Sequence, residues 1–118
     1  MKRLLALVLA FGISTAASAS LRFFETDYLP ESKTHQYTVR LDGSTRYMLT
    51  STSCSGGADY DLEVIDPDGK SVVKSTSTSE DFDFVRFDSG ETGNYTLKIT
   101  AYKGNNWYTL TLISPYKN

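Results

Sequence analysis

Residues 58–69, with the sequence ADYDLEVIDPDG, constrain the fold of this chain more than any other stretch. Leu62 and Val64 alternate with the charged Asp61 and Glu63. Alternation with a period of two is typical of a β-strand that buries one face. A Pro-Asp-Gly sequence follows, in which proline fixes one backbone angle and glycine accepts a positive φ. The stretch therefore predicts a half-buried strand that ends at a tight turn.

The same order of strand, polar turn and strand recurs along the chain. The strand candidates are residues 21–28, 36–41, 46–51, 60–65, 72–75, 82–88, 95–102 and 107–113. No segment beyond the N-terminal region has helical periodicity, and β-branched and aromatic residues fill the strands. We expect an all-β fold, an antiparallel sandwich or barrel of about eight strands. The predicted core residues are Leu62, Val64, Val85, Phe87, Tyr95, Leu97, Ile99, Leu110 and Leu112.

Residues 1–19 have the features of a Sec-type signal peptide. Two basic residues precede an apolar run at 4–13, and the small residues 17–19 fit a cleavage site. An N-terminal membrane anchor is the alternative, but the run is shorter than the ~20 residues that span a bilayer. We expect cleavage after residue 19, one mature domain over 20–118, no membrane span, and a secreted or periplasmic location.

The expected mature domain is acidic and contains one cysteine. It keeps ten Lys and Arg residues against fourteen Asp and Glu residues, a net charge near −4. An acidic domain without a basic run is a poor candidate for binding nucleic acid or an anionic membrane. Cys54 has no partner for a disulfide within the chain. We interpret it as a small, partly buried side chain, and an intermolecular disulfide or a reactive thiol is the alternative.

Three motifs follow one another along the chain: 59–70 (DYDLEVIDPDGK), 91–99 (ETGNYTLKI) and 108–112 (YTLTL). Together they resemble the D-x-D-L-x-V-x-D-P-x-G core, the T-G-x-Y strand start and the final Y-x-L strand of the bacterial pre-peptidase C-terminal domain. This resemblance, over residues 37–112, implies a jelly-roll-like β-sandwich. It also implies a module that usually follows a secreted protease and aids secretion or binds polymers, with calcium in some members. No protease precedes the domain here, so we expect a stand-alone module.

The sequence does not indicate a catalytic site. His35 is the single histidine, so a Ser-His-Asp site would have to use it. No nucleophile motif such as G-x-S-x-G accompanies it. We interpret His35 as an exposed structural residue and expect that the chain is not an enzyme.

Asp59 and Asp61 are the candidate metal ligands. Residues two apart in an extended strand point to the same side. Calcium takes several hard oxygen ligands, and carbonyl groups of the 53–57 loop could add to the two carboxylates. The alternative is that these acids only solubilise a strand end. Calcium is therefore the one cofactor that the sequence suggests.

Tyr102 and Trp107 are the candidate binding residues. Each lies on the polar face of its predicted strand, and the four residues between them have the length of a hairpin loop. We predict two cross-strand aromatic rings with Lys103, Asn105 and Asn106 at the rim, suited to stacking on a sugar ring or a peptide. The alternative is an aromatic pair that only stabilises the hairpin.

These features lead us to expect an exported, non-catalytic binding module. Its partner would be an extracellular polysaccharide or a protein such as a collagen-like substrate. One alternative is a structural, assembly or secretion partner of a secreted enzyme such as a protease. Another is an enzyme inhibitor that inserts a loop. A binding module would expose a fixed aromatic platform, whereas an assembly partner would expose an apolar patch or an unpaired edge strand.

Overall fold

The computed structural model describes residues 20–53, 58–75 and 82–117, and these residues form eight β-strands. The strands are β2 (Ser20–Leu29), β3 (Thr34–Leu41), β4 (Thr45–Ser53), β5 (Asp59–Ile65), β6 (Ser71–Lys74), β7 (Phe82–Asp88), β8 (Gly93–Lys103) and β9 (Asn106–Lys117). The described part of the chain contains no helix that could cross a membrane. The predicted signal peptide and Cys54 lie outside the described residues.

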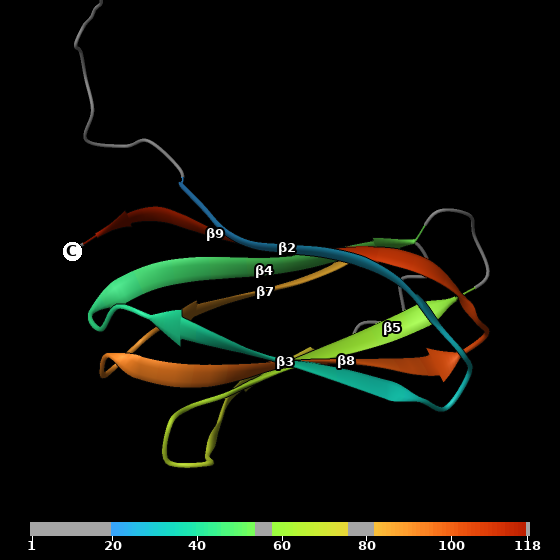
Figure 1. The fold of residues 1–118 in the computed structure, drawn as a ribbon, viewed down its shortest axis with the longest axis horizontal. Helices are drawn as coiled ribbons and strands as arrows, with labels where there is room; N and C mark the ends of the chain where they lie inside the picture. The colour runs from blue at the N-terminus through green and yellow to red at the C-terminus, as the bar shows by residue number, and fades with distance from the viewer. Residues whose placement is uncertain (1–19, 54–57, 76–81, 118) are drawn as a thin grey trace, which may run out of the picture.

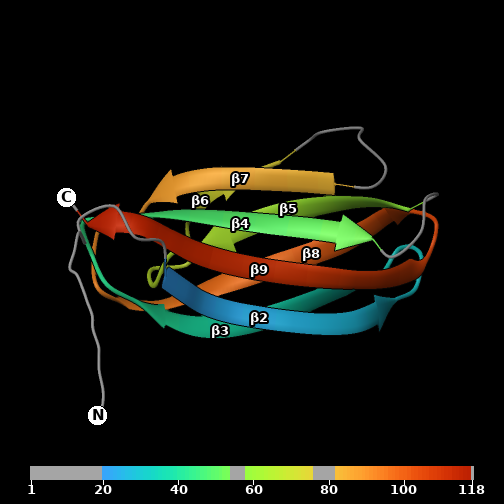
Figure 2. The same ribbon diagram turned by 90° about the horizontal axis from the view of Figure 1, so that it is seen from above.

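Strand pairing is nested along the chain. β2 pairs with β9, β3 with β8, β4 with β7 and β5 with β6, and every pair is antiparallel. The chain is thus one long hairpin whose tip is the turn at 66–70. Rolling this hairpin gives two sheets with the orders β2-β9-β4-β7 and β3-β8-β5-β6 (Figures 1 and 2). This is a jelly roll, which confirms the predicted all-β, antiparallel, jelly-roll-like sandwich.

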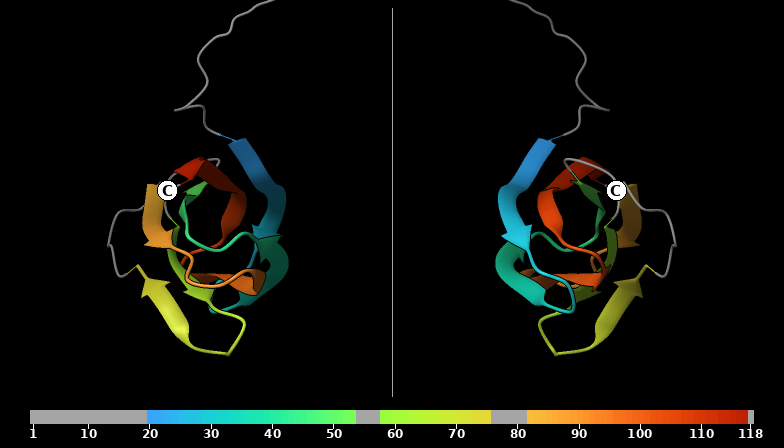
Figure 3. Two further views of the ribbon diagram at one scale, coloured as in Figure 1. Left: turned by 90° about the vertical axis from the view of Figure 1, so that its left-hand side faces the viewer. Right: turned by 90° about the vertical axis from the view of Figure 1, so that its right-hand side faces the viewer.

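The end-on views show the two sheets facing each other (Figure 3), and the buried side chains of the core lie between them. Every residue that the alternation predicts to be buried is buried: Leu62, Val64, Val85, Phe87, Tyr95, Leu97, Ile99, Leu110 and Leu112. Tyr47 stacks on Phe87 with 5.5 Å between ring centroids, and Phe87 in turn contacts the ring of Tyr95. Burying one such large apolar side chain stabilises the fold by about 1.5–3 kcal/mol.

Strand β7 shows why the period-two pattern predicts the faces well. Val85 and Phe87 point into the core, whereas Phe84 and Arg86 are exposed on the outer side. Asp83 is also buried, and its carboxylate accepts a hydrogen bond from the Ser75 hydroxyl. A buried polar group is tolerated when it is hydrogen-bonded in this way.

Candidate functional site

Three loops gather at one end of the sandwich, which we call the loop end. They are the β3–β4 loop (42–44), the β5–β6 loop (66–70) and the β7–β8 loop (89–92). They lie at the left of Figure 1, and the left panel of Figure 3 looks onto them. The nested antiparallel pairing brings these connections together although they are far apart in the sequence.

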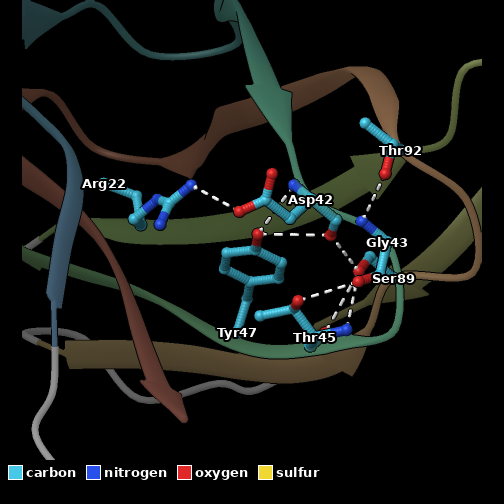
Figure 4. Close-up of polar contacts among 7 residues, drawn as sticks. All are labelled: Arg22, Asp42, Gly43, Thr45, Tyr47, Ser89 and Thr92. Atoms are coloured by element: carbon cyan, nitrogen blue, oxygen red, sulfur yellow. Dashed lines mark hydrogen bonds and ion pairs between the residues drawn. The ribbon is translucent and has the colours of Figure 1, made fainter. Parts of the chain in front are cut away.

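The β3–β4 and β7–β8 loops are joined by direct hydrogen bonds (Figure 4). The Ser89 hydroxyl, which is buried, donates to the carbonyl oxygen of Asp42 at 2.5 Å. The backbone N–H of Ser89 donates to the carbonyl oxygen of Thr45 at 2.9 Å. The backbone N–H of Gly43 donates to the Thr92 hydroxyl at 2.8 Å. These bonds brace one loop against the other, so both are held in a fixed position.

Tyr47 and Arg22 hold Asp42 from the other side (Figure 4). The Tyr47 ring is fully buried, and its hydroxyl accepts a hydrogen bond from the Asp42 backbone N–H at 3.0 Å. The Arg22 guanidinium lies 3.2 Å from the Asp42 carboxylate. The β3–β4 loop is therefore fixed by a residue of the core and by an ion pair with β2.

Gly43 is required by close backbone packing. A Cβ atom at this position would lie 2.9 Å from the backbone nitrogen of Thr92 and 3.1 Å from the carbonyl oxygen of Gly90. Real Cβ atoms essentially never approach backbone atoms below 3.0 Å. A larger residue at 43 would therefore push the two loops apart.

The β5–β6 turn folds as the sequence predicts. The Asp66 carboxylate accepts hydrogen bonds from the backbone N–H groups of Asp68 and Lys70, each at 2.9 Å. Gly69 has a φ of 88°, which an ordinary side chain would strain. Pro67 packs closely on Gly93. A Cβ atom added at position 93 would lie only 2.8 Å from the Cγ atom of Pro67. The turn is thus rigid in itself and fixed against β8.

An acidic cleft separates the β5–β6 turn from the β7–β8 loop. Its volume is about 470 Å³, and carboxylates line both sides. Asp66 and Asp68 come from the β5–β6 turn, Asp88 from the end of β7 and Glu91 from the β7–β8 loop, and Lys70 is the cation among the lining residues. Repulsion by Asp68 is the main cause that raises the pKa of Glu91. The scaffold therefore holds like charges close together at an exposed site.

The predicted hairpin between Tyr102 and Trp107 is wrong. Strand β8 pairs with β3 and β5, whereas β9 pairs with β2 and β4, so residues 104–105 cross from one sheet to the other. Tyr102 is 70% exposed and Trp107 is 50% exposed, but they belong to different sheets. The cross-strand neighbour of Trp107 is Tyr28, whose ring lies edge-on at 6.0 Å.

Loop length caused this error, because a short connection fits both a hairpin and a tight crossing between sheets. Gly104 has a φ of 77°, which permits the sharp turn. Lys103 ends β8, Asn105 lies in the crossing and Asn106 begins β9, so these residues do not form the rim of a Tyr102–Trp107 platform. Binding by these residues stays a prediction.

Asp59 and Asp61 lie close enough for their charges to interact. Burial first, and then repulsion by Asp59 and Asp83, raise the pKa of Asp61, while Lys74 lowers it. A register irregularity between Asp59 and Tyr60 leaves both of these residues buried. Within the described residues, no three His, Cys, Asp or Glu side chains group as a metal site would require. Calcium binding by the pair stays a prediction.

His35 lies at the β2–β3 side of the sandwich and is partly buried rather than exposed. Its Nδ1 atom is 2.9 Å from the Tyr108 hydroxyl and 3.7 Å from the Asp27 carboxylate. The Tyr108 hydroxyl also bonds the Tyr37 hydroxyl, and burial raises the pKa of Tyr108 well above its ordinary value. His35 belongs to β3 and Tyr108 to β9, so these contacts join the two sheets. This position is consistent with a structural role for His35.

Sequence patterns predict the individual turns of the loop end, but they do not predict that the β3–β4 and β7–β8 loops contact each other. An Asp-Gly pair at 42–43 and the polar stretch 89–93 both predict turns. Their association depends on the pairing of β3 with β8 and of β4 with β7, which is long-range information. The brace made by Ser89 and Thr92 is therefore visible only in the structure.

No family model matches the chain. Among solved structures, the chain is similar to PliG of Aeromonas hydrophila, a periplasmic lysozyme inhibitor of g-type lysozyme. The TM-score is 0.56 and the sequence identity is 10%, over 88% of this chain and 91% of that chain. At this identity the likeness shows a shared fold.

Proposed function

We propose that this chain is an exported inhibitor that binds a cell-wall-degrading enzyme of the lysozyme class through the loop end. The shared fold with a periplasmic lysozyme inhibitor supports this proposal over nearly the whole length of both chains. It favours the inhibitor alternative of the sequence analysis over a stand-alone polymer-binding module. A periplasmic or secreted location, served by the predicted signal peptide at 1–19, belongs to the same proposal.

The observation that carries the proposal is the bracing of the three loops. Hydrogen bonds from Ser89 and Gly43, and the packing of Pro67 on Gly93, fix these loops before any partner binds. A pre-organised loop loses little conformational entropy on binding, which leaves more of the interaction energy as affinity. Enzyme–inhibitor complexes typically show such small changes in interface backbone.

The negative charge of the loop end also supports this end as the enzyme-binding surface. Asp68 and Asp66 face Glu91 across the cleft, and their negative charges raise the pKa of Glu91. An enzyme that acts on an acidic cell-wall polymer gains from a basic surface, because opposite charge steers its substrate towards it. Lysine or arginine side chains on such an enzyme would relieve the repulsion and provide electrostatic complementarity.

We also propose that the chain has no catalytic activity of its own. His35 is the single histidine, and its Nδ1 atom contacts the Tyr108 hydroxyl and the Asp27 carboxylate. The carboxylates of the loop end belong to an open surface cleft, whereas a carboxylate acting as a general acid is usually buried so that its pKa rises towards neutrality. An inhibitor needs a rigid surface that blocks the enzyme, and this requirement is met without a reacting group.

Inhibition of purified lysozymes tests the proposal. Residues 20–118 are titrated into a g-type lysozyme, and into a lysozyme of another type, while the clearing of a cell-wall suspension is followed. We expect near-stoichiometric inhibition of one enzyme, and we expect Glu91→Lys to weaken it at least tenfold. Glu31→Lys makes the same change of net charge in the β2–β3 turn, at the opposite end, and should have little effect.

Two results would contradict the proposal. If neither lysozyme is inhibited by a large molar excess of the chain, the inhibitor function is wrong. If Glu31→Lys weakens inhibition as much as Glu91→Lys, only net charge matters, and the loop end is not the binding surface.

A further inference from the structure

The outer face of the β2-β9-β4-β7 sheet carries rows of aromatic rings and threonine hydroxyls. Cross-strand register places Phe24, Thr111, Thr50 and Phe84 in one row, one residue from each strand. Phe24 is 57% exposed and Phe84 is 45% exposed. Neighbouring strands are ~4.8 Å apart, so the two edge positions are separated by about 14 Å, with hydroxyl groups between them.

A second row follows the same plan. It consists of Thr26, Thr109, Thr52 and Phe82. The hydroxyls of Thr26 and Thr109 are 3.3 Å apart, and the Phe82 ring lies 5.8 Å from that of Phe84. The next pair along the sheet is Tyr28 and Trp107, also exposed. We call the exposed residues of these three rows the aromatic–threonine face.

The aromatic–threonine face carries no charged side chain. Among the described residues, the Arg86 guanidinium lies at the edge of the face, 6.0 Å from the centre of the Phe84 ring, and Arg46 pairs with Asp88 at 3.1 Å towards the loop end. The outer face of the other sheet differs, because Glu63 and Lys98 form an ion pair there. In an acidic domain, rows that contain no charged residue favour an uncharged partner.

We propose that the aromatic–threonine face binds an extended, uncharged polysaccharide chain. Aromatic rings offer flat apolar surfaces on which the C–H faces of sugar rings can stack. Threonine hydroxyls both donate and accept hydrogen bonds, as sugar hydroxyls do. A second copy of the protein would bury these threonine hydroxyls with few partners, which is unfavourable. The proposal concerns a different surface from the loop end and does not depend on the inhibitor function.

Titration with soluble oligosaccharides tests the proposal. The probes are N-acetylchitohexaose and cellohexaose, and the signal is the fluorescence of Trp107, the single tryptophan. We expect one probe to shift the emission at millimolar concentration or below. Insoluble chitin and cellulose then serve to compare variants. Phe84→Ala and Trp107→Ala should each weaken retention on the polymer at least tenfold.

Val72→Ala is the control, because it shortens an exposed apolar side chain on β6 of the other sheet, and it should bind as the parent does. Melting curves verify that each variant folds. Trp107→Ala also removes the contact with Tyr28; if it unfolds, Phe84→Ala decides. Lysozyme inhibition by Phe84→Ala should equal that of the parent, which separates this proposal from the inhibitor function.

Three results would overturn the polysaccharide proposal. The first is the absence of binding to all four probes. The second is an equal loss of binding in Val72→Ala. The third is a concentration-dependent dimer, seen by sedimentation, that Phe84→Ala abolishes, because the occupant of the face would then be a second copy of the chain.

Discussion

Leu97 lies in β8, between β3 and β5, and its side chain has no exposed surface. Leu97→Ala removes apolar contacts and leaves a cavity, so we expect it to lower the free energy of unfolding by about 2–5 kcal/mol. Leu21→Ala makes the same change at a residue that is 62% exposed and should cost under about 1 kcal/mol. Urea unfolding measures both. Equal losses would show that Leu97 does not pack in the core.

Asp61 is a residue whose ionisation opposes folding. Burial and the neighbouring Asp59 raise its pKa in the folded state above the ordinary value of 3.8. The folded state therefore binds the proton more tightly, and this contribution to stability is lost as pH rises through the raised pKa. We expect Asp61→Asn to melt above the parent at pH 7 and near it at pH ~3. A lower melting temperature at pH 7 would mean that the carboxylate has a stabilising partner.

Calcium binding gives a different signature at the same residue. If Asp59 and Asp61 hold the ion, adding calcium should raise the melting temperature of the parent, because the ion binds only the folded state. Asp61→Asn should lose most of that rise. Melting curves with calcium and with a chelator make the comparison, and identical curves for the parent would exclude the site.

At the scale of single elements, the loops of the loop end depend on backbone packing. Gly43→Ala would place a Cβ atom against the backbone of Thr92, so we expect it to cost about 1–3 kcal/mol and to weaken lysozyme inhibition. Gly90→Ala is the matched control in the facing loop, because a Cβ atom there meets nothing within 4 Å. Thermal unfolding and inhibition assays compare the two. Equal inhibition by both variants would show that the brace is not needed for function.

The sequence predicts single elements better than their association. Alternation identifies each buried face, because every strand packs one side against the core, as Leu62 and Val64 in β5 show. It does not distinguish a hairpin from a crossing, so the connection between Tyr102 and Trp107 is misassigned. The aromatic–threonine face is a similar case: Phe24 and Phe84 are each visible as exposed positions, but their common row follows from sheet order.

At the scale of the whole molecule, two surfaces of opposite character should respond differently to salt. The carboxylates of the loop end should speed association with a basic enzyme, so the association rate constant should fall as salt rises. Oligosaccharide binding to the uncharged face should be nearly independent of salt. Stopped-flow fluorescence measures the first and equilibrium titration the second. A salt-independent association rate would contradict the electrostatic role of the loop end.

The central claim is that the jelly roll holds three braced loops at one end as an enzyme-binding surface. Hydrogen–deuterium exchange of the chain, alone and with an equimolar g-type lysozyme, tests it most directly. We predict slower exchange on complex formation in residues 42–44, 66–70 and 89–92, with the β2–β3 turn at 30–33 unchanged. Protection confined to that turn or to the aromatic–threonine face, or no protection at all, would contradict the account.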